Sequence, residues 1–376
     1  MQKNNYNILI WYLGRKGGGA KEALEVARAF KQLDGYNAFV ALSNENELYD
    51  ETVINSCDSF CISTFPNIIG LACNIIKIPL YRLSLKHFLQ QNSIDLVYCI
   101  MGNWFDNFLL PVIFSLSIPC AYTVHDAIKH VGEADRKYFN TISRMTGKSS
   151  SVVTHSQSVS NQLNEILPVE NKMVTVPLGT FQYNNQQEPR HLIKNHAVHL
   201  LFFGRIEEYK GLDITLQAFQ LLQEHGYNVC LDIYGNGDIT KYKDRIDNTD
   251  NISCYNRWID EGEIPQIFIK SDIVVLSYIE ASQSGVIPIA IGFGVPSVCT
   301  PVGGLTEQIS KYMCGRVGER VDASSLAKEI EYLIDHDDEY YKLSCQCIEN
   351  SKKYSWNGIV LQLIEKWKDQ GLLNEK

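Results

Sequence analysis

Short apolar runs of strand length alternate with helical patterns along almost the whole chain. Between the strand candidates of the first half lie four helical patterns, at Gly19–Leu33, Asn103–Leu116, Asp135–Met145 and Ser158–Leu167. Continuous apolar strands separated by helices are typical of a parallel, doubly wound sheet, so the sequence predicts an α/β fold. The strand candidates are Tyr6–Leu13, Asn37–Leu42, Asp95–Ile100, Cys120–Val124, Ser151–His155 and Met173–Val176.

A polar, proline-containing segment, Gly179–Val198, interrupts this alternation and is typical of an interdomain linker. The alternation then begins again. The later strand candidates are His199–Phe203, Val229–Tyr234, Ile273–Ser277, Ser297–Thr300 and Gly315–Val317. The later helix candidates are Lys210–Glu224, Glu261–Lys270, Ser284–Phe293, Ser324–Asp335 and Asn357–Lys368. We predict one doubly wound domain over residues 1–180, a linker over 181–197, a second such domain over 198–355 and a final helix within 356–376.

Composition excludes several classes of protein. Of the 376 residues 45% are hydrophobic, which is enough for two cores, and the net charge of −9 disfavours nucleic acid as a partner. The eleven cysteines are scattered, and several lie in apolar runs, which favours buried thiols in a reducing cytoplasm. They have no zinc-ligand spacing, so we expect no metal site. The opening apolar run is too short for a secretory signal, and no run reaches the ~20 residues of a membrane span.

The segment Gly14–Glu22 carries three consecutive glycines, Gly17, Gly18 and Gly19, between the first strand and its helix. Glycines let the backbone approach a ligand closely, and a helix N-terminus favours an anion. The segment lacks the dinucleotide fingerprint, whose third glycine is replaced by Glu22, and the Walker loop, whose Lys-Ser/Thr is replaced by Ala20-Lys21. A tight turn with no ligand is the alternative.

Two cations follow the first strand of the second domain. Arg205 comes directly after Gly204, and Lys210 stands at the predicted start of a helix. A guanidinium and an ammonium at one strand end suit a diphosphate. Pairing with Glu207 and Glu208 on the surface is the alternative.

A carboxylate ends a later strand. Glu280 precedes a short loop, Ser282, Gln283, Ser284 and Gly285, whose backbone amides we expect to meet phosphate at a helix start. The carboxylate would then accept hydrogen bonds from hydroxyls of a group attached to that phosphate. Glu280 as a helix N-cap is the alternative.

Two further segments carry candidate groups. His125 and Asp126 lie at the carboxyl end of a buried strand, where ligands of such sheets bind, although a lone histidine is often structural. The acidic run Asp335–Glu339 contains Asp-x-Asp but links two late helices, so it is interpreted as solvated charge.

With these residues in place, the chain resembles retaining glycosyltransferases of family 4, which have the GT-B fold of two Rossmann-like domains facing a cleft. The resemblance is carried by "FFGRIEEYKG", "VPLGTF", "DIYGNGD", "EIPQIFIKSDIVVLSYIEASQSG" and "GVPSVCTPVGG" in this order, and by "YSW" before a last helix that resembles the family's crossover to the first domain.

The resemblance implies roles by position. Arg205 and Lys210 would hold the donor diphosphate, Glu280 would bind sugar hydroxyls, and His125 would lie near the reacting sugar, which makes these four the candidate catalytic residues. Gly17 to Gly19 match a loop closing over donor and acceptor. The remaining expected donor-site residues are Gly204, Ser282, Gln283, Ser284 and Gly285, and those expected near the base are Tyr234, Gly235, Asn256, Arg257 and Trp258. One departure is clear, because Pro288 stands where the family has a second glutamate that binds ribose.

The expected function is therefore metal-independent, retaining transfer of a sugar from a nucleotide diphosphate to a glycan or lipid-linked glycan, without a cofactor, in assembly of O-antigen, capsule or exopolysaccharide. The alternatives are a nucleotide-sugar 2-epimerase of the same fold and a non-catalytic nucleotide-sugar-binding subunit; the missing fingerprint disfavours a dehydrogenase. The apolar, basic segment Ile68–Leu89 predicts contact with the inner face of the membrane, or a core helix pair broken at Pro79.

Overall fold

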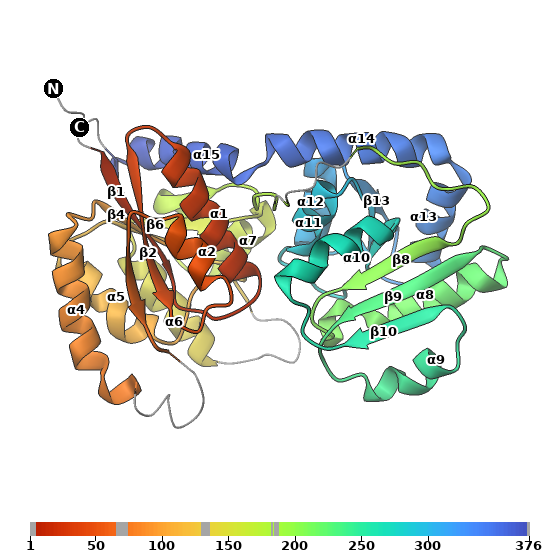
Figure 1. Cartoon of the computed structure of the whole chain (residues 1–376), viewed down its shortest axis with the longest axis horizontal. Coiled ribbons are helices and arrows are strands. Elements are labelled where there is room, and N and C mark those ends of the chain that lie inside the picture. The colour runs from red at the N-terminus through yellow and green to blue at the C-terminus, as the bar shows by residue number, and fades with distance from the viewer. Residues whose placement is uncertain (1–4, 65–73, 129–135, 182, 184–187, 374–376) are drawn as a thin grey trace. The chain divides into compact units, whose positions relative to one another are not determined.

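The computed structural model describes residues 5–64, 74–128, 136–181, 183 and 188–373, which form two compact units (Figure 1). Unit 1 contains the described residues up to 179 together with 356–373, and unit 2 contains the described residues of 180–355.

The sheet of unit 1 has seven parallel strands in the order β3-β2-β1-β4-β5-β6-β7. From β1 the chain adds strands on one side and then returns to add β4 on the other, where Ile10 of β1 aligns with Tyr98 of β4. The strand order therefore reverses between β1 and β4. The strands are β1 Tyr6–Tyr12, β2 Tyr36–Ser43, β3 Asp58–Ile62, β4 Leu96–Cys99, β5 Cys120–Thr123, β6 Ser151–Thr154 and β7 Met173–Thr175.

Helices pack on this sheet, and the last helix of the chain belongs to the same unit. Trp367 of α15 meets Tyr98 edge-on with ring centroids 5.1 Å apart, and Asn357 donates a hydrogen bond of 2.8 Å to Gln32 of α1. Figure 1 shows α15 beside α1. The helices of unit 1 are α1 Gly18–Gln32, α2 Tyr49–Ile54, α4 Ile78–Gln91, α5 Asp106–Ser115, α6 Arg136–Lys148, α7 Gln157–Ile166 and α15 Trp356–Asp369, with a 3₁₀ turn at Glu170–Lys172.

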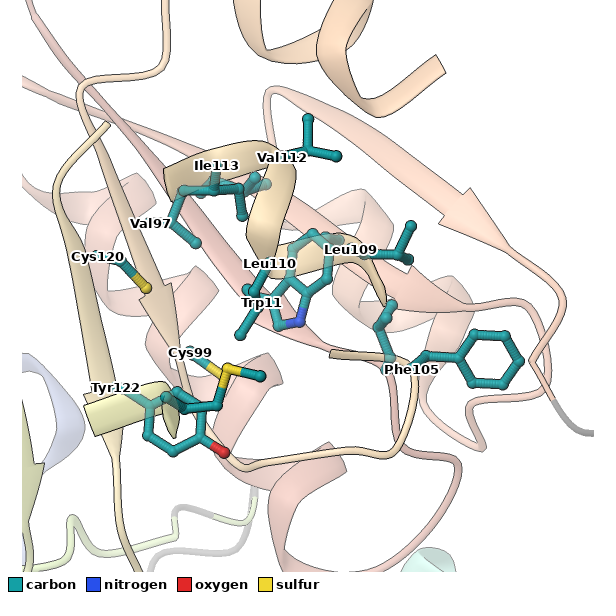
Figure 2. Close-up of a cluster of buried hydrophobic side chains, with 14 of the residues drawn as sticks. Trp11, Val97, Cys99, Phe105, Leu109, Leu110, Val112, Ile113, Cys120 and Tyr122 are labelled. Atoms are coloured by element: carbon teal, nitrogen blue, oxygen red, sulfur yellow. The ribbon is translucent and has the colours of Figure 1, made fainter. Parts of the chain in front are cut away.

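The core of unit 1 is centred on Trp11, which is fully buried between the sheet and α5 (Figure 2). Its indole Nε1 donates a hydrogen bond of 2.8 Å to the carboxylate of Asp106, the first residue of α5. The buried thiols of Cys99 and Cys120 lie in the same cluster. With Cys299, which is buried in unit 2, they are free, as the sequence predicted.

The sheet of unit 2 has six parallel strands in the order β10-β9-β8-β11-β12-β13, so its order reverses between β8 and β11. The strands are β8 Val198–Phe203, β9 Val229–Gly235, β10 Ile252–Asn256, β11 Ile273–Leu276, β12 Ser297–Cys299 and β13 Gly315–Val317. The helices are α8 Leu212–Glu224, α9 Lys243–Asp247, α10 Ile264–Lys270, α11 Val286–Gly292, α12 Gly303–Tyr312, α13 Ala323–Asp335 and α14 Asp337–Lys353; 3₁₀ turns lie at Glu208–Lys210, Thr240–Tyr242 and Glu261–Glu263. The two parallel sheets with their helices confirm the predicted α/β fold.

Candidate functional site

The candidate diphosphate residues of unit 2 lie where its strand order reverses, which is where ligands of open parallel sheets bind. Gly204 and Arg205 follow β8, and Glu280 follows the neighbouring strand β11. The end of β9 approaches them so closely that a Cβ on Gly235 would stand 1.7 Å from the carbonyl oxygen of Gly204. Only glycine fits at position 235, because its φ is also +152°.

Lys210 does not begin a helix, so this prediction is wrong. It ends the 3₁₀ turn Glu208–Lys210, and Gly211 follows with φ +66° before α8 begins. A Cβ on Gly211 would stand 2.0 Å from the carbonyl oxygen of Ser277, and the Ser277 hydroxyl donates to the carbonyl oxygens of Lys210 and Gly211 at 3.0 and 2.8 Å. This close approach ties Lys210 to the end of β11.

Tyr278 connects the two cations. The Lys210 ammonium donates a hydrogen bond to the Tyr278 hydroxyl, which lies 3.0 Å from the Ser284 hydroxyl. Arg205 reaches the Tyr209 hydroxyl at 3.4 Å, and the Tyr209 ring meets the Tyr278 ring edge-on. Burial raises the pKa of Tyr278, opposed by the hydrogen bond with Ser284 and the charge of Arg205. Tyr278 therefore stays neutral and contacts Lys210 and Ser284 directly, while Arg205 contacts Tyr209, which packs on Tyr278.

Residues of α12 fix the loop after Glu280 through hydrogen bonds and close packing. Gln308 accepts a hydrogen bond of 2.7 Å from the Ser284 amide and donates one of 3.1 Å to the Ser284 carbonyl oxygen. The expectation that the Ser284 amide meets a ligand is therefore wrong, because Gln308 occupies it. Gly304 bonds to the Ala281 carbonyl oxygen at 3.0 Å, and a Cβ on Gly304 would stand 1.9 Å from the Ser282 carbonyl oxygen.

The residues predicted near the base lie at the ends of β9 and β10. The Tyr234 ring stacks on Tyr255 at 4.3 Å, and Asn256 exchanges two hydrogen bonds of 3.1 Å with the backbone of Gly237. The Arg257 guanidinium makes two hydrogen bonds of 2.7 and 2.6 Å to Glu263 and lowers the pKa of that carboxyl to about 2. Trp258, which follows, is half-buried.

A pocket of about 590 Å³ opens on the same edge of the sheet. It is lined by Ile206, Glu207, Glu208, Gly237, Asp238, Thr240, Lys241 and Tyr242. Glu207 and Glu208 therefore face this pocket and make no ion pair with Arg205 or Lys210 among those found in the described residues; Glu208 lies 4.0 Å from Lys241.

In unit 1 the glycine-rich loop packs on Tyr12. A Cβ on Gly14 would stand 2.3 Å, and one on Gly19 2.5 Å, from atoms of the Tyr12 side chain. Glycine is therefore needed at these two positions so that the loop can pack against Tyr12. Gly17, with φ +83°, caps α1 and donates its amide to Glu47 at 2.6 Å. A Cβ on Gly18 would meet no atom within 4 Å.

His125 follows β5, as predicted, and meets two residues that sequence reasoning did not single out as site residues. Its Nε2 lies 2.9 Å from the Ile100 carbonyl oxygen and 3.7 Å from the carboxylate of Glu22, and His155 Nε2 lies 3.3 Å from the other oxygen of Glu22. Among the described residues, Glu22, His125 and His155 form the one group whose atoms are close enough to hold a metal ion. His155 could have been found, because it ends the predicted run Ser151–His155 beside β5.

A pocket of about 430 Å³ lies beyond the ends of β1 and β4, where the strand order of unit 1 reverses. Trp104 stands half exposed at this pocket and packs edge-on against Phe105 and Phe108. The pocket is lined by Leu13, Gly14, Arg15, Thr64, Asn103, Trp104 and Phe105.

The helix α4 exposes apolar and basic side chains together. Leu80 and Leu83 are 66% and 67% exposed, and Arg82 and Lys86 are also exposed, so we name these four residues the α4 surface. Pro79 lies in the first turn of α4, and helical residues 74–76 precede α4, separated from it by a turn at Lys77. Residues 68–73 of the predicted membrane segment lie outside the described residues. In the described part of the chain, no helix combines the length and hydropathy that crossing a bilayer requires.

The fold and the position of these residues define the class of protein. Anabaena HepE, solved with UDP and glucose, superposes with a TM-score of 0.74 over 97% of this chain and 100% of its own, at 16% identity. WaaG, a glycosyltransferase involved in lipopolysaccharide biosynthesis, superposes with a TM-score of 0.61 over 96% of this chain and 99% of its own, at 13% identity. Both show the GT-B fold in this chain.

The family profile Glycosyltransferase Family 4 matches residues 16–180, and the profile Glycosyl transferases group 1 matches residues 197–336. The chain belongs to the GT-B glycosyltransferases of family 4. Protein CapJ of Staphylococcus aureus is 22% identical over 69% of this chain and 60% of its own length. A D-inositol 3-phosphate glycosyltransferase of Paenarthrobacter aurescens is 25% identical over 53% of this chain and 51% of its own.

Proposed function

We propose that unit 2 binds a nucleotide-diphosphate sugar and that the protein transfers the sugar to an acceptor hydroxyl with retention. The observation that carries this proposal is the convergence of Arg205 and Lys210 on the packed pair Tyr209 and Tyr278 at the strand-order reversal. Two cations held at one strand end suit the two adjacent phosphates of a donor. The complexes of HepE with UDP and UDP-glucose support a nucleoside diphosphate as the leaving group.

In this mechanism the acceptor oxygen forms a bond to the anomeric carbon on the face from which the diphosphate leaves, and the bond to the diphosphate breaks. The acceptor proton passes to a diphosphate oxygen. Each bond that breaks is therefore matched by one that forms, and the reaction requires no protein nucleophile. Arg205 and Lys210 stabilise the charge that develops on the diphosphate, and removal of one such donor typically costs about 10²–10³ in rate. Glu280 orients the sugar, and His125 positions or polarises the reacting group.

The pocket at Trp104 is our candidate for the acceptor. A half-exposed indole offers an apolar face, while Asn103, Thr64 and Arg15 supply polar groups around it, which suits a carbohydrate. Together with the similarity to WaaG, a glycosyltransferase involved in lipopolysaccharide biosynthesis, this pocket supports a glycan acceptor in surface-polysaccharide assembly.

We also propose that the α4 surface holds the enzyme on the inner face of the membrane, close to a lipid-linked acceptor. No acidic residue occurs between Asn74 and Ile94, although the whole chain carries a net charge of −9. Exposed leucines beside exposed cations suit the boundary of anionic lipid headgroups and acyl chains. Arg82 also donates to the Phe108 carbonyl oxygen at 3.4 Å, and Phe108 packs on Trp104, so the α4 surface adjoins the proposed acceptor pocket.

The donor role is tested with purified wild type, Arg205→Ala, Glu280→Ala and the control Arg320→Ala. Arg320 is an exposed cation paired with Asp322, so it tests general loss of charge. Calorimetric titration with UDP and GDP, followed by transfer assays with their sugars, should show that only the first two variants lose activity while all keep their melting temperature. Wild-type turnover in Glu280→Ala refutes its role. Turnover of donor without acceptor favours the epimerase, and donor binding without transfer or hydrolysis favours the binding subunit.

The membrane role is tested by co-sedimentation with phosphatidylglycerol vesicles and with phosphatidylcholine vesicles. The double variant Leu80→Glu/Leu83→Glu should lose binding to the anionic vesicles, whereas Leu361→Glu, which changes an exposed leucine of α15, should retain it. Equal binding by both variants contradicts the proposal.

A further inference from the structure

The side chains that line the pocket at Trp104 offer more hydrogen-bond donors than acceptors. Among the described residues that line it, Arg15 is the one with a charged side chain. A guanidinium carries five N–H donors and no acceptor, and it stays charged in proteins. Arg15 is exposed, and the pocket volume of about 430 Å³ lies in the range of sites that take small molecules. The chemistry of this pocket therefore depends on what its other polar side chains offer.

The acceptor oxygens of those side chains already have partners. Asn103 Oδ1 accepts a hydrogen bond of 3.0 Å from the Phe105 amide, whereas its Nδ2 makes no hydrogen bond found within the described part of the chain. The Thr64 hydroxyl lies 2.7 Å from the Ser43 hydroxyl. The pocket thus presents a guanidinium and a side-chain amide donor. Such a lining suits a ligand group that is rich in acceptor oxygens and negatively charged.

A neighbouring loop fixes the backbone of Arg15 at the edge of this pocket. The Glu47 amide donates a hydrogen bond of 2.8 Å to the Arg15 carbonyl oxygen, and Asn46 Nδ2 donates one of 3.3 Å to the Gly14 carbonyl oxygen. The Glu47 carboxylate accepts a hydrogen bond of 2.6 Å from the Gly17 amide. Arg15 is therefore carried by a backbone that side chains and amides of the loop hold in place.

The carboxylates closest along these elements have other partners. Glu45 accepts a hydrogen bond of 3.0 Å from the Thr64 amide, and Asp106 accepts one of 2.6 Å from the Asn103 amide. Neither carboxylate belongs to the residues that line the pocket. The α4 surface, which adjoins the pocket through Phe108, adds two cations from a segment without acidic residues. The charge around the pocket is therefore positive.

We propose that this pocket takes an acceptor sugar that bears an anionic group, which Arg15 and the Asn103 side-chain amide bind while the sugar packs on Trp104. The inference rests on the proposed function for the presence of a sugar in this pocket, and it adds the charge of that sugar. Two sources supply the same chemistry: the carboxylate of a uronic acid in a glycan, and the phosphate that joins a sugar to a lipid. A guanidinium binds either group through two parallel N–H···O bonds.

The test follows the binding of three glycosides by fluorine NMR of the full chain labelled with 5-fluorotryptophan, alone and with UDP or GDP. The chain has five tryptophans, and Trp104→Phe identifies the signal of Trp104. Methyl glucuronoside and methyl glucoside 6-phosphate should bind roughly 10- to 100-fold more tightly than the neutral methyl glucoside, which is the usual effect of a hydrogen bond to a charged group. This preference should weaken as salt is added.

Arg15→Gln should abolish the preference for the anionic glycosides and leave the binding of methyl glucoside as in wild type. Lys16→Gln is the matched control, because it removes a neighbouring exposed cation that does not belong to the lining of the pocket. A tighter complex with the glucuronoside indicates a uronic acid, and one with the phosphate indicates the lipid phosphate; either result upholds the inference.

Equal affinities of wild type for the three glycosides, or an Arg15→Gln protein that keeps the preference, overturn the inference while the sugar pocket of the proposed function stands. If no glycoside moves the Trp104 signal, the inference and the acceptor pocket fail together, and donor binding by calorimetry still tests the donor site by itself. An Arg15-dependent preference without transfer from any donor sugar upholds the anion site and counts against the proposed transfer.

Discussion

The Lys210 ammonium lies 3.9 Å from the centre of the Tyr278 ring while it donates a hydrogen bond to the hydroxyl of the same side chain. The ring face and the hydroxyl oxygen both attract the cation, so the two contacts with Tyr278 fix the position of the Lys210 ammonium. The neutral Tyr278 adds no negative charge of its own beside a cation that we propose to bind a diphosphate.

Tyr278→Phe should weaken donor binding while the fold is kept. The change leaves the ring under Lys210 but removes the hydroxyl that joins it to Ser284. A hydrogen bond to a charged group contributes about 1.5–3 kcal/mol, so the dissociation constant for a nucleoside diphosphate should rise at least tenfold. Tyr340→Phe is the control, because the buried Tyr340 donates to the Asp272 carbonyl oxygen at the other end of β11. Equal affinities in the two variants would contradict this role of the hydroxyl.

Gly304→Ala should disturb the loop after Glu280. The new Cβ would lie 1.9 Å from the Ser282 carbonyl oxygen, so α12 or the loop must move. Overpacking of this kind typically costs about 1–3 kcal/mol, and we expect a lower melting temperature together with weaker donor binding. Gly262→Ala adds the same methyl group where no atom lies within 4 Å, and should change neither. A Gly304→Ala protein with wild-type affinity would show that the position of Ser282 is unimportant for the donor.

The sequence predicts the interior strands well because their residues are continuously apolar. It misses β3 and β10, which lie at sheet edges and are partly exposed, so "DSFCI" and "ISCYN" have no clear hydrophobic pattern. It also misses α14, which begins in the acidic run after Asp335, because charge at a helix N-terminus resembles a solvated loop.

The residues of the candidate site likewise divide into those that the sequence could predict and those that it could not. Residues that follow strands, such as Arg205, Glu280 and His125, can be predicted because the carboxyl ends of neighbouring parallel strands meet at one edge. Tyr278 and Gln308 could not be predicted, because they matter through contacts between distant segments: Tyr278 through Lys210, and Gln308 through Ser284. The assignments of role remain predictions, whereas the placement of the strands is observed.

Trp104→Ala should raise the KM for the acceptor and leave donor affinity unchanged. The indole forms one side of the proposed acceptor pocket, and an aromatic contact is typically worth about 0.5–1.5 kcal/mol beyond its buried area, so the KM should rise about two- to tenfold. The measurement is initial-rate kinetics at saturating donor, with donor binding followed separately. Phe139→Ala, which changes an exposed aromatic residue of α6, is the control. A change in donor affinity with an unchanged acceptor KM would place the acceptor elsewhere.

Asp106 should make the stability of unit 1 depend on pH in the direction opposite to ordinary carboxylates. Burial raises its pKa to about 7, although hydrogen bonds from Trp11 and the Asn103 amide favour the ionised form. The folded state therefore holds a proton between about pH 4 and 7 that the unfolded state releases, so this contribution is present below pH 4 and is lost as the pH rises to 7. The loss is on the order of a few kcal/mol.

The measurement compares the denaturant midpoints of wild type and Asp106→Asn at several pH values. Because the amide does not titrate, the stability of wild type relative to the variant should fall steadily between pH 4 and 7. Asp335→Asn, which changes an exposed carboxylate that accepts from Tyr227, should show no such fall. Since Asp106 also accepts a hydrogen bond of 2.6 Å from the Asn103 amide, the same ionisation acts on the loop that lines the proposed acceptor pocket. A difference that is constant over this range would show that the two hydrogen bonds outweigh burial and that Asp106 is ionised throughout.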